Sequence, residues 1–314
     1  MVQGAAFNLI YPRERGRETF QSIMFYTKAP ARLLIFSLLI AICYGREPAL
    51  DVPIPQARPM SVAPILQKAR QAEGSLTAGD SFFLTVGTNR IALRWIPSGH
   101  FIMGSPVLEP YRDTDEIQHQ VTLKHGFFLA ETECPQSLWE KVMGTNPSHG
   151  KGLDLAVNQV NWKEILKFCD TLTTLHREQG ILPVGCRWSL PTEAQWEYAC
   201  RARTVGAYAG NLDEMAWLEG NSKGKSHPVG SKKPNDWGLY DMHGSAAEWC
   251  RDGYIAYTTN SVIDPVGSES IDSKCVRGGN WLYGDRRCRS AARGTMSSGV
   301  KGDYIGFRLL LSLH

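Results

Sequence analysis

Two carboxylates flank a glycine turn in the C-terminal half of the sequence. Asp241 and Glu248 enclose Gly244 and Ala246, where the side chains are small. Ca²⁺ prefers several oxygen ligands, both carboxylate and main-chain carbonyl, on a flexible loop. The segment 241–248 is therefore a candidate calcium site, and a solvated acidic loop that caps a turn is the alternative.

Sulfur is the second possible source of chemistry. Thiolates are the ligands that Cu(I) prefers, and thiols of exported chains can form disulfides. No two cysteines have the C-x-x-C spacing of a structural zinc site, so we do not expect one. Without Cys43, which lies in the apolar N-terminal segment, the chain has seven cysteines. Because seven is odd, at least one thiol is free or pairs outside the chain. The seven are Cys134, Cys169, Cys186, Cys200, Cys250, Cys275 and Cys288.

Arginines and histidines give weaker signals. Arg277, Arg293 and Arg308 lie in the C-terminal third. Arginine forks bind carboxylates in pairs of hydrogen bonds, and we expect these three to hold loops against buried Asp or Glu in preference to substrate. The histidines are scattered without helical spacing, so none is assigned a role as a metal ligand.

The elements that position these residues are short. Thirty glycines, 17 prolines and nine tryptophans are typical of a loop-rich fold packed around aromatic side chains. Helix-start signals predict three helices. These are a helix from Pro135 to about Met143, one from Asn161 to Gly180, and one that begins after Thr192.

Apolar runs between turns predict the strands. Ser81 to Trp95 contains two of them around a turn at Gly87. We expect further strands at 101–104, 120–123 and 127–129, and a last buried strand at 305–311. Two main helices among short, irregular strands indicate an α+β fold with much ordered coil.

The N-terminus has the pattern of a signal peptide. Lys28 and Arg32 precede the apolar run 33–44, which is too short to span a bilayer, and the small Gly45 suits cleavage. Met24 is a better-placed start than Met1. We assign 1–45 to the signal peptide, with an uncleaved membrane anchor as the alternative, and expect an exported protein in a periplasmic, extracellular or secretory-lumen compartment. Lipidation at Cys43 is disfavoured, because Ile42 stands where a small residue is needed.

Proline-rich residues 46–80 predict a linker or arm, which leaves 81–314 as one domain. The formal charge of +3 arises at the N-terminus, because residues 1–46 hold six Lys or Arg and two Asp or Glu. The rest of the chain is nearly neutral and has no basic stripe, so we expect no nucleic-acid partner. We expect no membrane span after signal cleavage.

Six motifs occur in order along the chain. They are FIMGS (101–105), RWSLPTEAQWEYA (187–199), NDWGLYDMHG (235–244), VRGGNW (276–281), AAR (291–293) and GFR (306–308). Together they resemble the formylglycine-generating-enzyme and sulfatase-modifying-factor family. The resemblance covers roughly residues 92–311 and implies that family's fold, a variant of the C-type-lectin-like fold with little regular secondary structure.

The resemblance also implies metal sites. Asp241, Gly244, Ala246 and Glu248 match positions that bind calcium through two side chains and two main-chain carbonyls. The family has a tryptophan where this chain has Ala247, so packing there must differ. The family's copper site uses two cysteines five residues apart after a Gly-Gly pair.

Counted forward from Gly279, the two copper-binding positions are Tyr283 and Cys288. One thiolate is therefore missing, and Cys288 is the remaining catalytic candidate, with Cys275 or His243 as conceivable partners. Counted back from 291–293, the loop is three residues shorter than the enzyme's, and Cys288 falls between the family's two positions, so one thiolate is missing in this alignment as well.

Disulfides are also implied. Cys169 and Cys200 match family cysteines whose partners fall at Leu309 and Ser290. A Cys200–Cys288 disulfide is a hypothesis because Cys288 lies near Ser290 in the sequence.

Two functions follow from the resemblance. The first is copper-dependent oxidation of a cysteine to formylglycine in unfolded exported sulfatases. The second is a non-catalytic module on the same fold that recognises a peptide, glycan or protein partner. Iron-dependent sulfur chemistry ranks last, because it needs a histidine cluster that this sequence does not show.

Overall fold

The computed structural model describes residues 76–313, and its first element is a β-hairpin. β1 (Ser81–Val86) and β2 (Asn89–Ile96) pair in antiparallel register around the turn at Gly87, as predicted. Alternate residues of both strands are buried, which is the expected pattern for a hairpin with one face on a core.

The C-terminal strand lies inside the sheet that contains this hairpin, one strand from its edge. The order is β1-β2-β5-β12-β6, formed with β5 (Phe127–Ala130), β12 (Leu310–Ser312) and β6 (Arg187–Ser189). The prediction of one strand over 305–311 was wrong. β11 (Ile305–Gly306) instead pairs with a different sheet, and Arg308 between the two strands turns its buried guanidinium onto Glu248.

Two smaller sheets complete the strands. The first has the order β10-β9-β7-β11, from β10 (Gly294–Ser297), β9 (Ser273–Arg277) and β7 (Ala247–Gly253). The second has the order β3-β4-β8, from β3 (Gly99–Met103), β4 (His119–Leu123) and β8 (Val262–Ile263).

The three predicted helices are present. α2 (Gln136–Met143) follows Pro135, while α3 (Trp162–Glu178) and α4 (Glu193–Arg201) both begin with the predicted capping boxes. The sequence did not predict the short helices α5 (Leu212–Met215) and α6 (Glu219–Ser222) or the 3₁₀ turn η1 (Asp285–Cys288).

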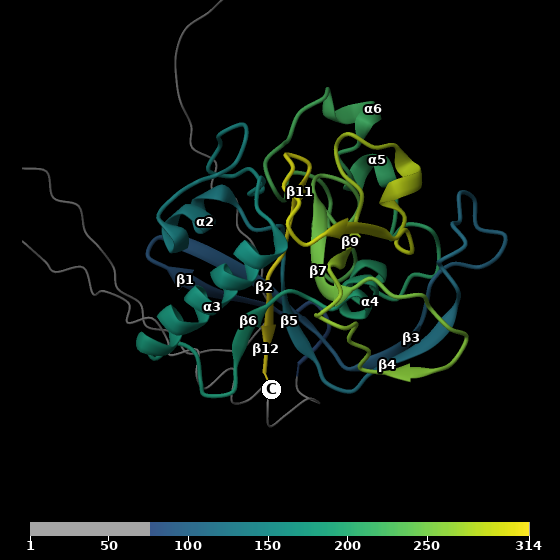
Figure 1. Cartoon of the computed structure of the whole chain (residues 1–314), viewed down its shortest axis with the longest axis horizontal. Coiled ribbons are helices and arrows are strands. Elements are labelled where there is room, and N and C mark those ends of the chain that lie inside the picture. The colour runs from purple at the N-terminus through teal and green to yellow at the C-terminus, as the bar shows by residue number, and fades with distance from the viewer. Residues whose placement is uncertain (1–75, 314) are drawn as a thin grey trace, which may run out of the picture. The chain divides into compact units, whose positions relative to one another are not determined.

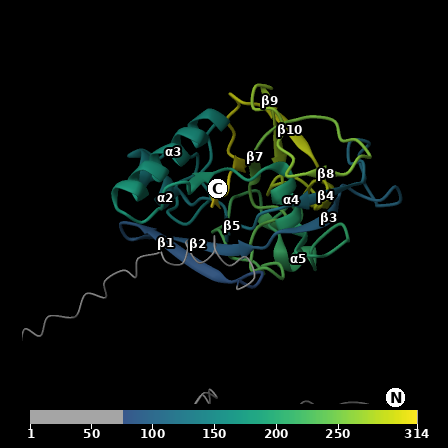
Figure 2. The ribbon, with the colours of Figure 1, turned by 90° about the horizontal axis from the view of Figure 1, so that it is seen from below.

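Aromatic side chains fill the core between the helices and the sheets. Figures 1 and 2 both show α2 and α3 together on one side of the molecule, with α4, β7 and β9 on the other. On the first side, Trp139 of α2 stacks on Phe168 of α3 at 5.0 Å, and Phe307 packs against the edges of both. On the second side, Trp196 of α4 is fully buried. The α+β architecture with little regular secondary structure is confirmed.

The N-terminal predictions lie mostly outside the described residues. The signal peptide 1–45 and most of the linker 46–80 belong to that part of the chain. The end of the predicted linker is joined to the domain, because Gly79 donates to the Trp95 carbonyl and Arg94 donates to Gly79. Within 76–313, no helix has the length and apolar character needed to cross a bilayer.

Candidate functional site

A pair of glycines shapes one wall of the candidate site. β9 ends at Arg277, and Gly278 and Gly279 follow with φ angles of 94° and 68°, in the region that favours glycine. A Cβ on Gly279 would lie 2.6 Å from the Cys288 Sγ. The glycines therefore let the chain fold back directly over Cys288, which places residues 280–287 beside the end of β9.

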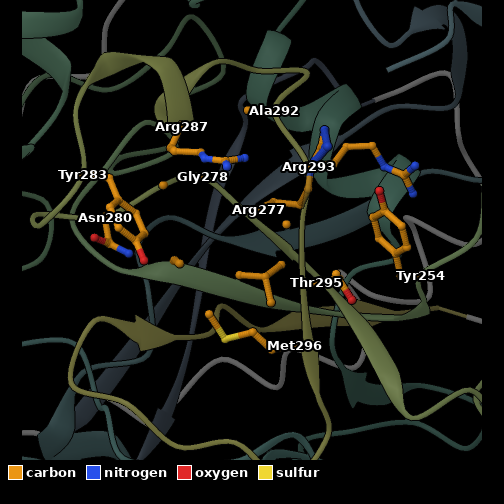
Figure 3. A pocket seen from close by; sticks show the side chains of 14 residues that line it. Tyr254, Arg277, Gly278, Asn280, Tyr283, Arg287, Ala292, Arg293, Thr295 and Met296 are labelled. Atoms are coloured by element: carbon orange, nitrogen blue, oxygen red, sulfur yellow. The ribbon is translucent and has the colours of Figure 1, made fainter. Parts of the chain in front are cut away.

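A pocket of about 440 Å³ opens beside this turn, as Figure 3 shows. Asn280 and Tyr283 stand at one end of the pocket in that view and Tyr254 at the other, with Arg277 between them. The remaining lining residues are Ala247, Val276, Gly278, Gly279, Arg287, Ala292, Arg293, Gly294, Thr295 and Met296.

Buried ion pairs fix two of the pocket's arginines. Arg293 forms two hydrogen bonds of 2.8 Å with Glu193, and Arg277 donates to Glu197 at 2.5 Å. The pKa of Arg277 and that of Arg293 stay above the usual arginine range: burial opposes their charge, but the glutamates outweigh it. The prediction that these arginines hold loops against acidic residues is confirmed, and Arg308 does the same with Glu248 at 2.6 Å.

Two buried donors of the pocket have no acceptor among the described residues. They are the Asn280 Nδ2 and the Arg277 Nε. Both residues line the pocket, and both side chains are almost completely buried. A buried donor without a partner costs on the order of 1–3 kcal/mol, which an acceptor that reached it would recover.

Cys288 does not line the pocket. Its side chain is 0% exposed, and the Sγ donates to the Gly284 carbonyl at 3.7 Å. Burial raises the pKa of this thiol to about 12, so it is protonated at neutral pH. Tyr283 lines the pocket in its place, with a side chain that is 45% exposed.

The proposed partners of Cys288 make other contacts. The Cys275 Sγ donates to Glu193 at 3.3 Å, and the His243 Nδ1 lies 2.7 Å from the Cys288 carbonyl oxygen, not its sulfur. The pocket therefore lacks the two facing thiolates that a bis-thiolate copper site requires, and the described residues do not fit that group.

The predicted Cys200–Cys288 disulfide is not formed, and both residues are free thiols. The Cys200 Sγ instead lies 3.7 Å from the Ser290 Oγ and 3.7 Å from the His243 Nε2. Ser290 is the position at which the resemblance places the usual partner of Cys200. The short loop thus puts a serine at that position and directs Cys288 toward Gly279 and Gly284.

A second acidic residue faces Asp241. Asp241 adopts a φ of 59°, and its Oδ2 accepts a hydrogen bond from the Gly230 amide at 2.6 Å. Glu133, which follows β5, accepts from the Ala246 amide at 3.0 Å through Oε1. The Asp241 Oδ1 and the Glu133 Oε2 are buried and have no hydrogen-bond donor among the described residues.

Burial raises the pKa of both carboxyls, and the charges of Asp241 and Glu248 raise that of Glu133 further. The charge of Arg308 opposes this rise in pKa, and a proton or a cation between the two acids would relieve their repulsion further. Glu133 was not predicted, because it is far from Asp241 in sequence and only the fold brings the two together.

Glu248 is already occupied in the structure. Its two carboxylate oxygens accept from Arg308 at 2.6 and 2.7 Å, and the Oε2 also accepts from the Trp196 indole at 2.8 Å. A Cβ at Gly244 would lie 2.3 Å from the Trp217 carbonyl oxygen, which explains the glycine there. Across residues 76–313, no three His, Cys, Asp or Glu side chains converge on one metal position.

Comparison with known proteins identifies relatives over most of the described region. The family model described as FGE-sulfatase, the sulfatase-modifying factor enzyme 1-like domain, matches residues 88–313. A solved structure, Treponema denticola variable protein 1, has a TM-score of 0.67 at 29% identity and covers 73% of this chain and 98% of that one.

Two curated relatives have different names. The chaperone protein LppX of Paenibacillus barcinonensis is 26% identical over 239 residues, covering 61% of this chain and 82% of that protein. A formylglycine-generating enzyme of Streptomyces coelicolor is 31% identical over 147 residues, covering 39% of this chain but only 47% of the enzyme. The chain thus spans about half the length of that enzyme.

Proposed function

Because this chain belongs to the FGE-sulfatase family, we propose that it binds a segment of an exported protein in the pocket beside Gly278 and Gly279. In this proposal the pocket recognises the segment and does not oxidise it. The observation that carries the proposal is that a tyrosine, and none of the described cysteines, faces the pocket. Tyr283 lines it, while the Cys288 sulfur is enclosed beneath the glycine pair.

An edge strand supports a peptide as the ligand. β10 is the outermost strand of its sheet, and its residues Gly294, Thr295 and Met296 line the pocket. Edge strands can take up an extended peptide as an additional strand, with neighbouring pockets that select side chains. The name of one relative, a chaperone protein, agrees with a role in binding protein segments.

Ala247 gives this pocket part of its volume. It lines the pocket at the position where the resemblance places a tryptophan. A small residue there leaves room that an indole would occupy, so the pocket of this chain suits a bulky group of the ligand.

Calcium belongs to the same proposal as a structural ion. The unpartnered oxygens of Asp241 and Glu133 fit a hard cation, with main-chain carbonyls of Gly244 and Ala246 as further ligands. When bound, the ion would neutralise the two carboxylates and hold the loop 241–248, which leads into β7 and Ala247. Glu248 would act by fixing Arg308 and Trp196, since its oxygens are engaged there.

Export is the remaining part of the proposal. The N-terminal pattern is that of a signal peptide, and the proposed partners are unfolded sulfatases or other exported proteins. N-terminal sequencing of the protein recovered outside the cytoplasm tests it. A new N-terminus near residue 46 supports cleavage, while an intact apolar segment contradicts it.

A two-part assay tests binding against oxidation. The full chain is incubated with copper, oxygen and a peptide that carries a Cys-x-Pro-x-Arg motif, and mass spectrometry follows conversion of the cysteine. We expect no conversion. Conversion that depends on Cys288 would overturn the proposal in favour of formylglycine formation.

The second part measures binding. Labelled fragments of unfolded exported proteins are titrated with the full chain, and fluorescence anisotropy reports binding. Ala247→Trp fills the pocket and should weaken binding at least about tenfold through lost contact area. Ala256→Trp, at an exposed alanine that does not line this pocket, is the matched control. Equal binding by both variants would contradict the pocket assignment.

A further inference from the structure

We propose that the pocket beside Gly278 and Gly279 selects a segment with an acidic side chain, and that Arg287 is the residue that recognises its carboxylate. This inference rests on the proposed peptide-binding function and specifies its ligand.

The side chains that line the pocket supply donors and no carboxylate. Arg277, Arg287 and Arg293 all line it, and none of the described Asp or Glu residues does. Asn280 and Thr295 add an amide and a hydroxyl. A ligand rich in acceptors matches this set, because arginine forks bind carboxylates through two parallel hydrogen bonds.

The acidic partners of the inner arginines lie behind the pocket wall. Arg201, Arg277 and Arg293 share only two glutamates, Glu193 and Glu197. These arginines are therefore fixed in place, and the Arg277 Nε keeps a proton with no acceptor. Nearby negative charge also exists, since Glu109 and Glu116 flank Arg289, but both contact that arginine and neither lines the pocket.

Arg287 is the cation with freedom to move toward a ligand. Its side chain is 49% exposed, and its partner Asp113 is shared with Arg286. Arg286 holds the Asp113 Oδ1 at 2.5 Å, whereas Arg287 lies 3.3 Å from the Oδ2, so Arg287 has the longer contact of the two. An incoming carboxylate can thus pair with Arg287 without leaving Asp113 unpaired.

The buried donor of Asn280 gives the second contact. Its side chain is 0% exposed, its Oδ1 accepts from the Leu282 amide at 2.9 Å, and its Nδ2 has no acceptor among the described residues. The amide is therefore held in one orientation with a donor unsatisfied. A carboxylate or carbonyl at this end of the pocket would satisfy it.

The test compares three peptides that differ at one position. Acetyl-Gly-Ser-Phe-Xaa-Phe-Ser-Gly-amide is made with Xaa as Glu, Gln or Lys, and each is titrated with the full chain by isothermal calorimetry. We expect the Glu peptide to bind roughly three- to tenfold more tightly than the Gln peptide, because Arg287 is partly solvated. The Lys peptide should bind weakest, and added salt should narrow the differences.

Two arginine variants distinguish recognition from general charge. Arg287→Gln should bring the Glu and Gln peptides within about twofold of each other. Arg187→Gln is the matched control, because it removes an exposed arginine that neither lines the pocket nor pairs with Asp113, and it should keep the preference. A Glu preference that survives Arg287→Gln, or equal binding of the three peptides to the unaltered chain, overturns the inference.

Other outcomes of the binding measurements distinguish a failure of this inference from a failure of the proposed function. Peptides that bind equally but lose affinity in Ala247→Trp would leave the function standing and refute the acidic selection. No peptide binding at all would refute both. Inorganic phosphate that displaces the peptide without any Glu preference would identify a small-anion site and refute the acidic-segment form of the proposal.

Discussion

The paired acids Glu133 and Asp241 make a sharp prediction about calcium and pH. The pKa of each carboxyl is raised in the folded chain, chiefly by burial. In the absence of a cation, the folded state therefore favours their protonated forms. Their contribution to stability is fully present below the unfolded pKa values of about 4 and is lost as pH rises through the folded values.

Calcium should remove this loss, because the ion replaces the proton between the carboxylates. The gain in unfolding temperature on adding calcium should therefore be small near pH 4 and grow as pH rises toward 8. At a free calcium concentration of 100 times Kd, the ion contributes about 2.7 kcal/mol. For a domain of this size that corresponds to a rise of roughly 5–10 °C.

The assay is differential scanning calorimetry of the full chain in calcium and in chelator, across this pH range. The unfolding temperature in chelator is subtracted from that in calcium at each pH. This subtraction removes the contribution of other groups whose protonation changes on unfolding. Asp241→Asn should abolish the calcium effect and keep an acceptor for the Gly230 amide. Asp236→Asn, at an exposed residue nearby, should leave it unchanged.

The refuting result is specific. If calcium leaves the unfolding temperature unchanged at pH 7.5 while Asp241 and Glu133 are both intact, the two oxygens share a proton and not a cation. The proposed structural ion would then be excluded from this loop. A calcium effect that is equal at pH 4 and pH 8 would refute the proton–cation exchange.

Three other predictions follow from buried groups. Arg277→Met should lower the unfolding free energy by about 3–5 kcal/mol in urea titrations, because it leaves Glu197 with one fewer partner in a buried site. A loss below about 1 kcal/mol would contradict this. Burial raises the pKa of Asp252 to about 6, so stability from this group is lost as pH rises through that value. Asp252→Asn should therefore reduce the fall in unfolding free energy between pH 4 and 7 by about 3 kcal/mol. Peptide mapping under non-reducing conditions should recover Cys200 and Cys288 unlinked, with alkylation only after unfolding; a linked pair would show that the loop rearranges on oxidation.

Local signals in the sequence were enough to predict the three longer helices, α2, α3 and α4, and the family. The capping boxes at Asn161 and Thr192 involve residues three positions apart, so they form within a single helical turn regardless of the rest of the chain. The alternation of buried residues in β1 and β2 is also local. Six motifs in order identified the family because each preserves a turn, a cap or a buried arginine of the shared fold.

The predicted strand over 305–311 shows where prediction from neighbouring residues in the sequence fails. Residues 305–311 are nearly all apolar, so their pattern predicted one continuous strand. The structure divides it, because the buried Arg308 must reach Glu248, and that partner lies 60 residues away in sequence. Hydrophobic periodicity carries no information about which distant carboxylate an arginine will meet.

The sequence by itself determined the glycine pair and the candidate acids at 241–248, and the resemblance, counted forward from Gly279, predicted Tyr283 at a thiolate position. Only the tertiary structure decided that Glu133 faces Asp241, that Cys288 is enclosed behind Gly279, and that the arginines around the pocket outnumber their glutamates. The physical reason is that burial and charge pairing are set by neighbours in space. The residues that determine whether a carboxylate holds a proton, a guanidinium or a metal ion come from segments 52 to 113 residues apart.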